Sequence, residues 1–511
     1  MSTLPPRFKR NALSSYGTAV ASLVLAVAVT PILARGLGKE AYGIWGLATS
    51  TVLYFDLLKF GFGRATVKYV AAADAVGDTD GVRRTITTSA FTLALPGLLV
   101  LLVSPLAALL FPVVFDVPDD LKTAAIVLVL LSALDMAVAI PADTLGSTLI
   151  GYQRYDLLNA TLIATSVGQA SAWAVVIALD GGLVGIGVAT VAFSLSAQAV
   201  RYVMCRRLVG ERPLRRRDYD RRLVKPLLSM SGWVSISEVS DTIIDRVDAA
   251  VVGIVAGVPQ AAVYMVGQKL AALAARFTTP VTAPFFPHAS ALAAEKGASE
   301  ALKETIYAGT RISLAVVTPL MLVLAVLAAP AIDAWVGTGF EDAALVVVFL
   351  SAAQVIATVP RTPVYVLRGM GNVRGPALIR LLEAALNLPL SVALGLTMGF
   401  QGVALGTLIA AGAIELGVLL PYSCRKAGVS MMRLMYRSLR SILLPSLASL
   451  AVGVALQRLG VHGLIEVIGV GLAMLGVYVP VLFVTGLSAA ERRRLGGAIR
   501  QLRPGSAAGR G

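Results

Sequence analysis

Residues 86–111 read ITTSAFTLALPGLLVLLVSPLAALLF and contain no charged side chain. Arg83 and Arg84 stand just before this stretch, and Asp116, Asp119 and Asp120 follow it. About 20 mostly apolar residues are enough for a helix to cross the hydrocarbon core of a bilayer. The stretch therefore predicts a membrane-spanning helix with one basic end and one acidic end.

Comparable apolar stretches recur along the whole chain. Of the 511 residues, 57% are hydrophobic and only 14% are charged, which is too few charges for a soluble domain of this size. The ten-residue alternating pattern of outer-membrane barrels is absent. We predict an all-α polytopic membrane protein of about fourteen transmembrane helices. The candidate spans are roughly 14–34, 41–62, 86–111, 122–142, 158–179, 183–205, 227–255, 261–286, 308–329, 342–366, 376–397, 402–424, 438–457 and 464–485.

The net charge of +15 follows the positive-inside rule rather than indicating nucleic-acid binding, because the bases lie in short loops between spans. The predicted inner loops and tail hold Arg64, Lys68, Arg83, Arg84, Arg154, the run 206–225, Lys296, Lys303, Arg368, Arg374, Arg425, Lys426, Arg433, Arg437, Arg492, Arg493, Arg494, Arg500, Arg503 and Arg510. The predicted outer loops hold few bases and collect Asp116, Asp119, Asp120, Asp180, Glu341 and Asp342. This bias predicts that both termini lie in the cytoplasm.

No cofactor or metal site is expected from the sequence. Cys205 and Cys424 fall near predicted cytoplasmic helix ends, and two histidines, His288 and His462, complete no zinc-ligand pattern. A nucleotide-binding Gly-x-x-x-x-Gly-Lys-Ser/Thr loop is also absent, so the sequence predicts no ATPase. The apolar run 16–33 is too long for a signal peptide and is interpreted as the first span.

The chain also looks duplicated. Residues 38–42, 151–154, 185–190 and 205–207 line up, in order and at a nearly constant offset, with 257–261, 371–374, 402–407 and 424–426. Duplicated halves commonly enclose a central pathway with alternating access. The predicted divisions are an N-terminal six-helix lobe 1–212, a basic cytoplasmic linker 213–226, a C-terminal six-helix lobe 227–430, and two further helices with a basic tail, 431–511. The alternative is chance similarity between membrane segments.

Ionisable residues inside spans are the candidate site residues, because each costs several kcal/mol at the bilayer centre and usually faces an interior. Glu238, Asp241, Asp245 and Asp248 are spaced 3, 4 and 3 apart and share one helix face. Lys269 and Arg276, seven apart, share a face of the next span. If the two spans are antiparallel, Asp245 is level with Lys269, and Glu238 and Asp241 with Arg276. This predicts either a charged cavity wall or a salt-bridge ladder that only fixes packing.

The remaining charges within spans are more ambiguous. Asp56 and Lys59 stand at i and i+3, and Arg64 follows near the inner end of the same span. Arg64, Arg311 and Arg361 are candidate substrate-binding bases that could equally anchor helix ends at the membrane surface. Glu383 and Glu415 are interpreted as packing residues. The candidate substrate-binding bases are Lys59, Arg64, Lys269, Arg276, Arg311 and Arg361, and the candidate ion-coupling or base-orienting acids are Asp56, Glu238, Asp241, Asp245 and Asp248.

Several loose motifs resemble those of bacterial polysaccharide flippases over about residues 8–430. They are residues 35–45 (RGLGKEAYGIW), 60–70 (FGFGRATVKYV), Asp248 with 251–253 and 264–267, and 387–391 with 402–407. The resemblance extends to their superfamily, which also contains multidrug and toxin extrusion transporters and the lipid II flippase. It implies two six-helix lobes around a central cavity that opens alternately to each side.

By this resemblance, the protein is expected to be a flippase of the bacterial inner membrane and not an enzyme. It would carry an undecaprenyl-diphosphate-linked oligosaccharide outward for O-antigen, capsule or exopolysaccharide, with H⁺ or Na⁺ as a potential coupling ion. It would work as a monomer surrounded by membrane lipids, alone or together with other polysaccharide-assembly proteins. Two alternatives stay open. A multidrug cation antiporter would need a net acidic cavity, and a membrane glycosyltransferase or polymerase would need catalytic groups in a large outer loop.

Overall fold

The computed structural model describes residues 6–59, 61–210, 212–229, 232–275 and 299–486, and within these ranges every regular element is a helix. The chain divides into two compact units. The first comprises residues 1–266 and 380–406, and the second comprises residues 267–379 and 407–511. This division of contacts does not test the predicted lobe boundaries at 212, 226 and 430, which stay predictions.

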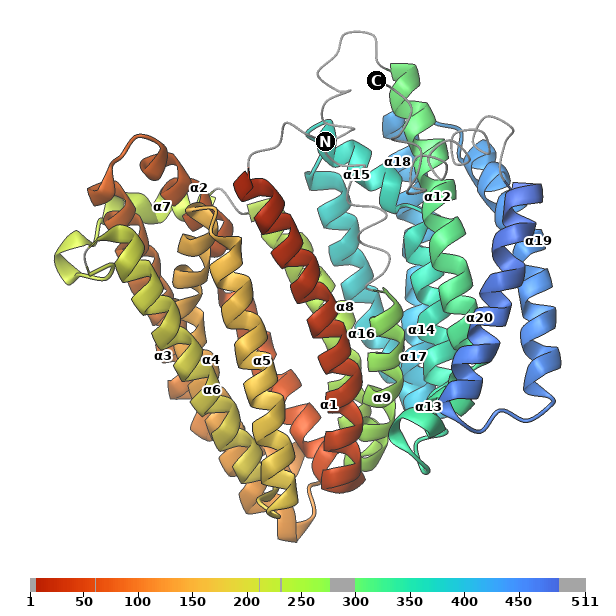
Figure 1. The fold of residues 1–511 in the computed structure, drawn as a ribbon, viewed down its shortest axis with the longest axis horizontal. Helices are drawn as coiled ribbons and strands as arrows, with labels where there is room; N and C mark the ends of the chain where they lie inside the picture. The colour runs from red at the N-terminus through yellow and green to blue at the C-terminus, as the bar shows by residue number, and fades with distance from the viewer. Residues whose placement is uncertain (1–5, 60, 211, 230–231, 276–298, 487–511) are drawn as a thin grey trace, which may run out of the picture. The chain divides into compact units, whose positions relative to one another are not determined.

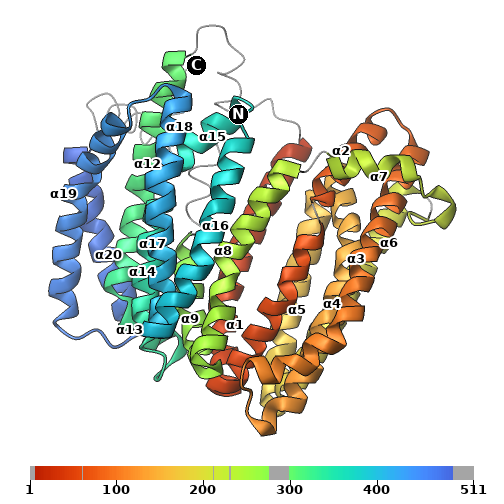
Figure 2. The ribbon, with the colours of Figure 1, turned by 180° about the vertical axis from the view of Figure 1, so that it is seen from behind.

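The first unit contains the helices that hold most of the candidate site. They are α1 (Pro6–Leu53), η1 (Tyr54–Lys59), α2 (Phe62–Ala75), α3 (Thr79–Val114), α4 (Asp119–Gly151), α5 (Tyr155–Ala178), α6 (Gly182–Val209), η2 (Arg216–Asp218), α7 (Arg221–Ser229), α8 (Gly232–Ala256), the first half of α9 (Val258–Ala275), most of α16 (Arg374–Met398) and the first half of α17 (Phe400–Ala411). Figures 1 and 2 show α3, α4, α5 and α6 running alongside one another.

The second unit holds the remaining helices. They are α12 (Ser299–Val326), α13 (Ala328–Val336), α14 (Ala343–Thr358), α15 (Arg361–Gly369), the π-helical η3 (Gly412–Leu419), α18 (Leu420–Ala427), α19 (Met431–Gln457), α20 (Leu464–Val481) and η4 (Leu482–Gly486), with the ends of α9, α16 and α17. Helix α19 packs against both α12 and α20.

The predicted fold class is confirmed. Ten helices of the described part are long and apolar enough to cross a membrane, and the predicted count of fourteen is consistent with them. Two further predicted spans fall in α1 and η1, where Gly38, at φ 78°, interrupts the helix between them. The other two correspond to α8, which carries several charges, and α9, which the structure describes only to residue 275.

One predicted inner loop is different in the structure. Residues 62–75, which contain Arg64 and Lys68, form helix α2 instead of a loop. Phe62, Ala65 and Val70 are buried on one face of α2, where they pack on the core of the first unit. Their helical spacing puts them on one face of α2, and this face is buried because it packs against α3 and α4. The sequence alone did not show that these two helices lie beside residues 62–75.

Small residues bring the helices of the first unit close together. A Cβ on Gly97 of α3 would lie 2.5 Å from the carbonyl oxygen of Ala137 on α4. The outer surface of α3 is apolar, with Leu95, Leu102 and Val113 each more than two-thirds exposed. Without water to drive helices together, close approach at small residues is the usual way in which membrane helices pack, and exposed leucines face lipid.

Candidate functional site

The best-defined group of charges within the helices joins α8 to α16. Arg380 donates to Asp241 Oδ1 through Nε at 3.0 Å and through Nη2 at 2.8 Å, and to Glu383 Oε2 through Nη1 at 2.6 Å. We call these three residues the Arg380 cluster. The Glu383 side chain is 4% exposed, whereas that of Asp241 is 48% exposed. The cluster thus combines one buried and one accessible carboxylate around a single base.

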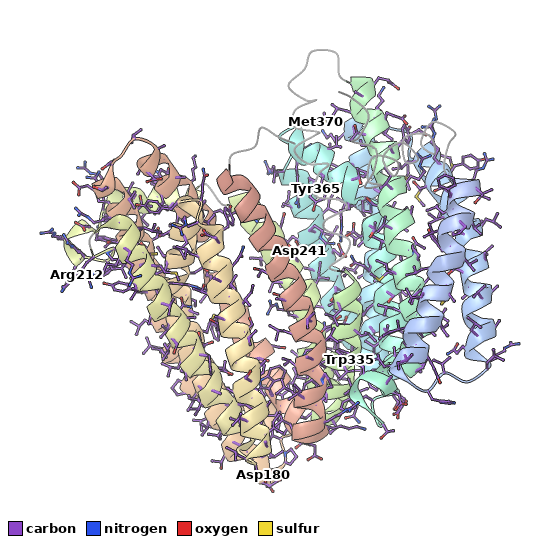
Figure 3. The ribbon with its side chains drawn as sticks, in the orientation of Figure 1. Asp180, Arg212, Asp241, Trp335, Tyr365 and Met370 are labelled. Atoms are coloured by element: carbon purple, nitrogen blue, oxygen red, sulfur yellow. The ribbon has the colours of Figure 1, made fainter. Side chains whose placement is uncertain are left out.

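Helical spacing explains how both helices present polar groups to each other. Arg380, Glu383, Asn387 and Ser391 follow one another at intervals of three or four residues and share a face of α16. Asp241 and Asp248, seven apart, share a face of α8 in the same way, and Figure 3 shows where Asp241 lies on this helix. Two polar faces in contact satisfy each other within the apolar surroundings, as buried polar groups require.

Asp248 is almost completely buried, at 1% exposure. Tyr264 of α9 donates its hydroxyl to Asp248 Oδ2 at 2.9 Å, and Ser391 of α16 donates to Oδ1 at 3.3 Å. A buried carboxylate is stabilised by such donors. Asp248 therefore links three helices of the first unit.

Replacing Tyr264 by phenylalanine is expected to lower the free energy of unfolding by about 1.5–3 kcal/mol, because a hydrogen bond to a charged group is lost. Ser391→Ala, which removes the longer bond, is expected to have the smaller effect. Melting temperatures of the two purified variants would measure this order. Equal stability of Tyr264→Phe and the unmodified protein would contradict the assigned bond.

A second group of charges lies between η1, α4 and α6. Lys59 Nζ lies 3.9 Å from Asp143 Oδ1. On α6, Arg201 donates to Thr161 Oγ1 at 3.2 Å and to Gln198 Oε1 at 3.4 Å, and Asp143 of α4 is an acid that interacts with it electrostatically. We call Lys59, Asp143 and Arg201 the Asp143 cluster. Its two bases and one acid give it a net positive charge.

The other predicted site residues are spread over several elements. Arg64 is exposed in the first turn of α2, Lys269 is partly buried on α9, Arg311 is partly buried on α12, and Arg361 begins α15. Arg276 lies outside the described residues, as do the side chains of Asp56, Glu238 and Asp245. The predicted pairings of Asp245 with Lys269, and of Glu238 and Asp241 with Arg276, therefore stay predictions.

Sequence reasoning missed three charged residues of these clusters. Arg380 was overlooked beside Glu383, although their i, i+3 spacing within a span was a usable signal. Asp143 and Arg201 stand in predicted spans or at their ends with no opposite charge at helical spacing. Their partners belong to helices that are distant in the sequence, so no local spacing pattern indicated that Asp143 and Arg201 form part of a cluster. Glu383, interpreted as a packing residue, is the buried acid of the Arg380 cluster.

Chemically, the two clusters suit charged ligands. Among the described residues, no group of three or more His, Cys, Asp or Glu side chains could hold a metal ion. The Asp143 cluster offers two bases to an anion, and the half-exposed carboxylate of Asp241 offers an acceptor to a cation. Such charges within membrane helices usually mark a substrate or ion pathway.

These helices and in-membrane charges define a polytopic α-helical membrane protein. The chain belongs to the polysaccharide biosynthesis protein family, whose model matches residues 32–345. It is 22% identical, over 80% of its own length and 81% of the relative's, to a Bacillus subtilis (strain 168) protein described as uncharacterized membrane protein EpsK.

Solved structures share the fold at low identity. An inward-facing multidrug resistance MATE family transporter of the MOP superfamily superposes with a TM-score of 0.64 at 16% identity, over 80% of this chain and 96% of that one. The lipid II flippase MurJ, in an inward closed conformation, superposes with a TM-score of 0.62 at 14% identity, over 93% and 97%. The family match and the shared fold confirm the resemblance to polysaccharide flippases of this superfamily.

Proposed function

We propose that this protein is a flippase that moves a lipid-diphosphate-linked oligosaccharide from the cytoplasmic to the outer leaflet of the inner membrane. Its membership of a polysaccharide biosynthesis family and the fold that it shares with a lipid II flippase support this function. The carrier is expected to be undecaprenyl diphosphate, and the glycan an O-antigen, capsule or exopolysaccharide unit. The protein would work by alternating access, as a secondary transporter and not an enzyme.

The net positive Asp143 cluster is the observation that carries the proposal. A diphosphate that leaves water needs cationic donors in its place, because burying an unpaired charge is costly. Arg201 supplies a planar guanidinium group that can donate two hydrogen bonds, and Lys59 supplies an ammonium group. Both residues belong to helices of the first unit. An inside-negative potential would favour export of the anionic head by about 2.3 kcal/mol per charge per 100 mV.

In this proposal, the residues that the sequence analysis singled out have two roles. Lys59, Arg64, Lys269, Arg276, Arg311 and Arg361 would contact the substrate. Asp56, Glu238, Asp241, Asp245 and Asp248 would bind a coupling H⁺ or Na⁺ or orient the bases. Within the Arg380 cluster, Asp241 is the accessible acid, which fits the coupling role.

The second candidate is a cation antiporter, which the excess of carboxylates in the Arg380 cluster favours. The two functions differ in their dependence on the Asp143 cluster. An anionic substrate needs Lys59 and Arg201, whereas a cationic substrate would be repelled by them.

The decisive test is transport of a fluorescent lipid-diphosphate oligosaccharide by the full chain in proteoliposomes. Replacing Lys59, Arg201, Lys269 or Arg276 by glutamine is expected to reduce flipping about tenfold or more, since each loses a charge-assisted contact. Arg276→Lys should lose less than Arg276→Gln, because it keeps the charge and loses only the fork. Arg222→Gln, on the exposed linker, is the control. Normal flipping by all four well-folded variants would refute the proposal.

Membrane orientation provides a separate prediction. We expect both termini in the cytoplasm, because bases gather in alternate loops. Figure 3 shows Asp180 and Arg212, which flank α6, at opposite ends of that helix, in keeping with this bias. Reporters fused at Arg510 and within residues 116–120 should lie on opposite sides. Reporters on the same side would contradict the orientation and the fourteen-span topology.

A further inference from the structure

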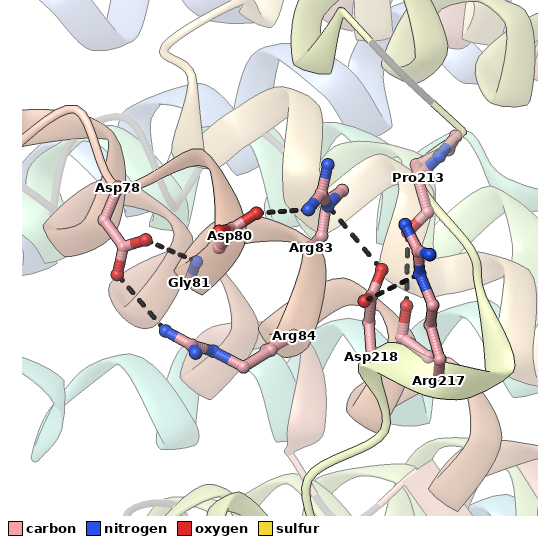
Figure 4. Close-up of polar contacts among 9 residues, drawn as sticks. Asp78, Asp80, Gly81, Arg83, Arg84, Pro213, Arg217 and Asp218 are labelled. Carbon is pink, nitrogen blue, oxygen red and sulfur yellow. Dashed lines mark hydrogen bonds and ion pairs between the residues drawn. The ribbon is translucent and has the colours of Figure 1, made fainter.

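The basic linker between α6 and α8 is fastened to the start of α3. Thr87 Oγ1 donates to the carbonyl of Pro213 at 3.3 Å, and the backbone N–H of Asp220 donates to Thr88 Oγ1 at 3.0 Å. Arg83 Nε lies 3.6 Å from Asp218 Oδ2, and Figure 4 shows this ion pair beside that of Arg83 with Asp80. The linker therefore holds a definite position on the first unit.

That position is at the edge of the lipid-facing surface. Along α3, large exposed apolar side chains begin with Phe91, which is 44% exposed, and continue through Leu95 toward Val113. The ring of Tyr219, in the linker, lies 6.3 Å from that of Phe91. Leu227 of α7 is buried in the same core cluster as Leu93 of α3. Helix α7 thus lies level with the first apolar turns of α3, where aromatic residues mark the membrane interface.

Helix α7 presents two different faces. Leu223 and Leu227 pack into the core of the first unit. Arg221, Val224, Lys225 and Leu228 follow the i, i+3, i+4, i+7 spacing of a single opposite face. With Tyr219, these four residues line an open cavity of about 450 Å³. The cavity has two bases at its rim and apolar side chains between them.

We propose that this cavity, which we call the α7 site, binds the headgroup of an anionic phospholipid of the cytoplasmic leaflet. Arg221 and Lys225 donate to the phosphate oxygens, and the guanidinium fork of Arg221 matches two of them. Val224, Leu228 and Tyr219 cover the glycerol backbone and the first methylenes of the acyl chains. Because α7 lies at the membrane interface, its two bases are at the level where phospholipid headgroups lie.

Charge complementarity separates this site from its neighbour. The adjacent cavity of about 500 Å³ is lined by Asp80, Arg83, Arg84, Arg217, Asp218, Tyr219 and Asp220. Its arginines already face aspartates: Arg83 pairs with Asp80 and Asp218, and Arg84 with Asp78 at 3.4 Å. The α7 site has no acid in its lining, so it is the cavity that suits an anion. Its apolar lining favours a lipid over a free phosphate.

The test measures lipid binding to the full chain in detergent by native mass spectrometry, titrating phosphatidylglycerol or phosphatidylcholine. Arg221→Gln/Lys225→Gln is expected to raise the dissociation constant of the first bound phosphatidylglycerol about tenfold or more. The matched control, Arg216→Gln/Arg222→Gln, removes the same charge from exposed linker positions outside the cavity and should change it by less than about threefold. Leu228→Asn, which keeps the charge, should also weaken binding.

Three results would overturn the proposal. Equal weakening by both double variants would mean diffuse attraction, and equal affinity for phosphatidylcholine would mean apolar contact alone. Inorganic phosphate, at a concentration on the order of 10 mM, is added as a competitor. Displacement of phosphatidylglycerol by it would mean that the site binds a free anion. Unchanged elution on size exclusion confirms that the variants fold. The readout is independent of transport, so it stands or falls separately from the flippase function.

Discussion

Arg380→Ala is expected to destabilise the protein more than any other single charge replacement among the described residues. It removes the base that pairs with Glu383, whose side chain is 4% exposed. Removing one partner of a buried ion pair costs about 3–5 kcal/mol, because the other charge stays buried. Asp241, which is 48% exposed, can be solvated and adds less. The measurement is the melting temperature of the purified protein in detergent, together with its yield.

Two further variants separate a structural role from a substrate role. Arg380→Met/Glu383→Leu removes the buried charge pair and fills its space with apolar side chains, so we expect most of the lost stability to return. If Arg380 also contacts the substrate, flipping stays low in this stable double variant. Arg433→Ala, at the exposed start of α19, is the control and should change stability by no more than about 0.5 kcal/mol. Equal stability of Arg380→Ala and Arg433→Ala would contradict the assigned cluster.

Gly97→Leu is expected to produce the largest packing defect. A Cβ at position 97 would lie 2.5 Å from the carbonyl oxygen of Ala137, which belongs to the backbone of α4 and cannot rotate away. Helices α3 and α4 would have to separate, and overpacking of this kind costs about 1–3 kcal/mol, occasionally more. Gly97→Ala should show the same defect to a smaller degree. Monodisperse elution and melting temperature in detergent are the measurements.

Gly476→Leu is the matched control for Gly97→Leu. Both glycines lie in apolar membrane helices, but a Cβ on Gly476 of α20 would meet no atom within 4 Å. Leucine at that position should leave the melting temperature unchanged or raise it, since leucine favours a helix more than glycine does. Equal melting temperatures of Gly97→Leu and Gly476→Leu would contradict the close approach of α3 to α4 at Gly97.

The all-helical membrane fold could be predicted because the bilayer imposes it directly on the sequence. A span needs a long uncharged stretch, and residues 86–111 provide one that the structure places inside α3. The acids at 241 and 248 could be expected to meet polar partners rather than lipid for a related reason, since a charge facing lipid is costly. Their helical spacing also predicted that they share a face of α8, and both make polar contacts with α16.

The partners of the charged side chains within the helices were determined only by the tertiary structure. The spacing of α8 and α9 predicts Arg276 as a partner of Asp241, and this pairing stays a prediction. The described base bound to Asp241 is Arg380, 139 residues away in the sequence, which no local spacing indicated. The described acid beside Lys59 is Asp143, of α4. The helicity of α2 and the depth of α7 likewise follow from the helices that they cover. Hydrophobic length and periodicity act locally along one chain segment, whereas ion pairing depends on which helices pack together, and that is determined by the shapes of all their surfaces at once.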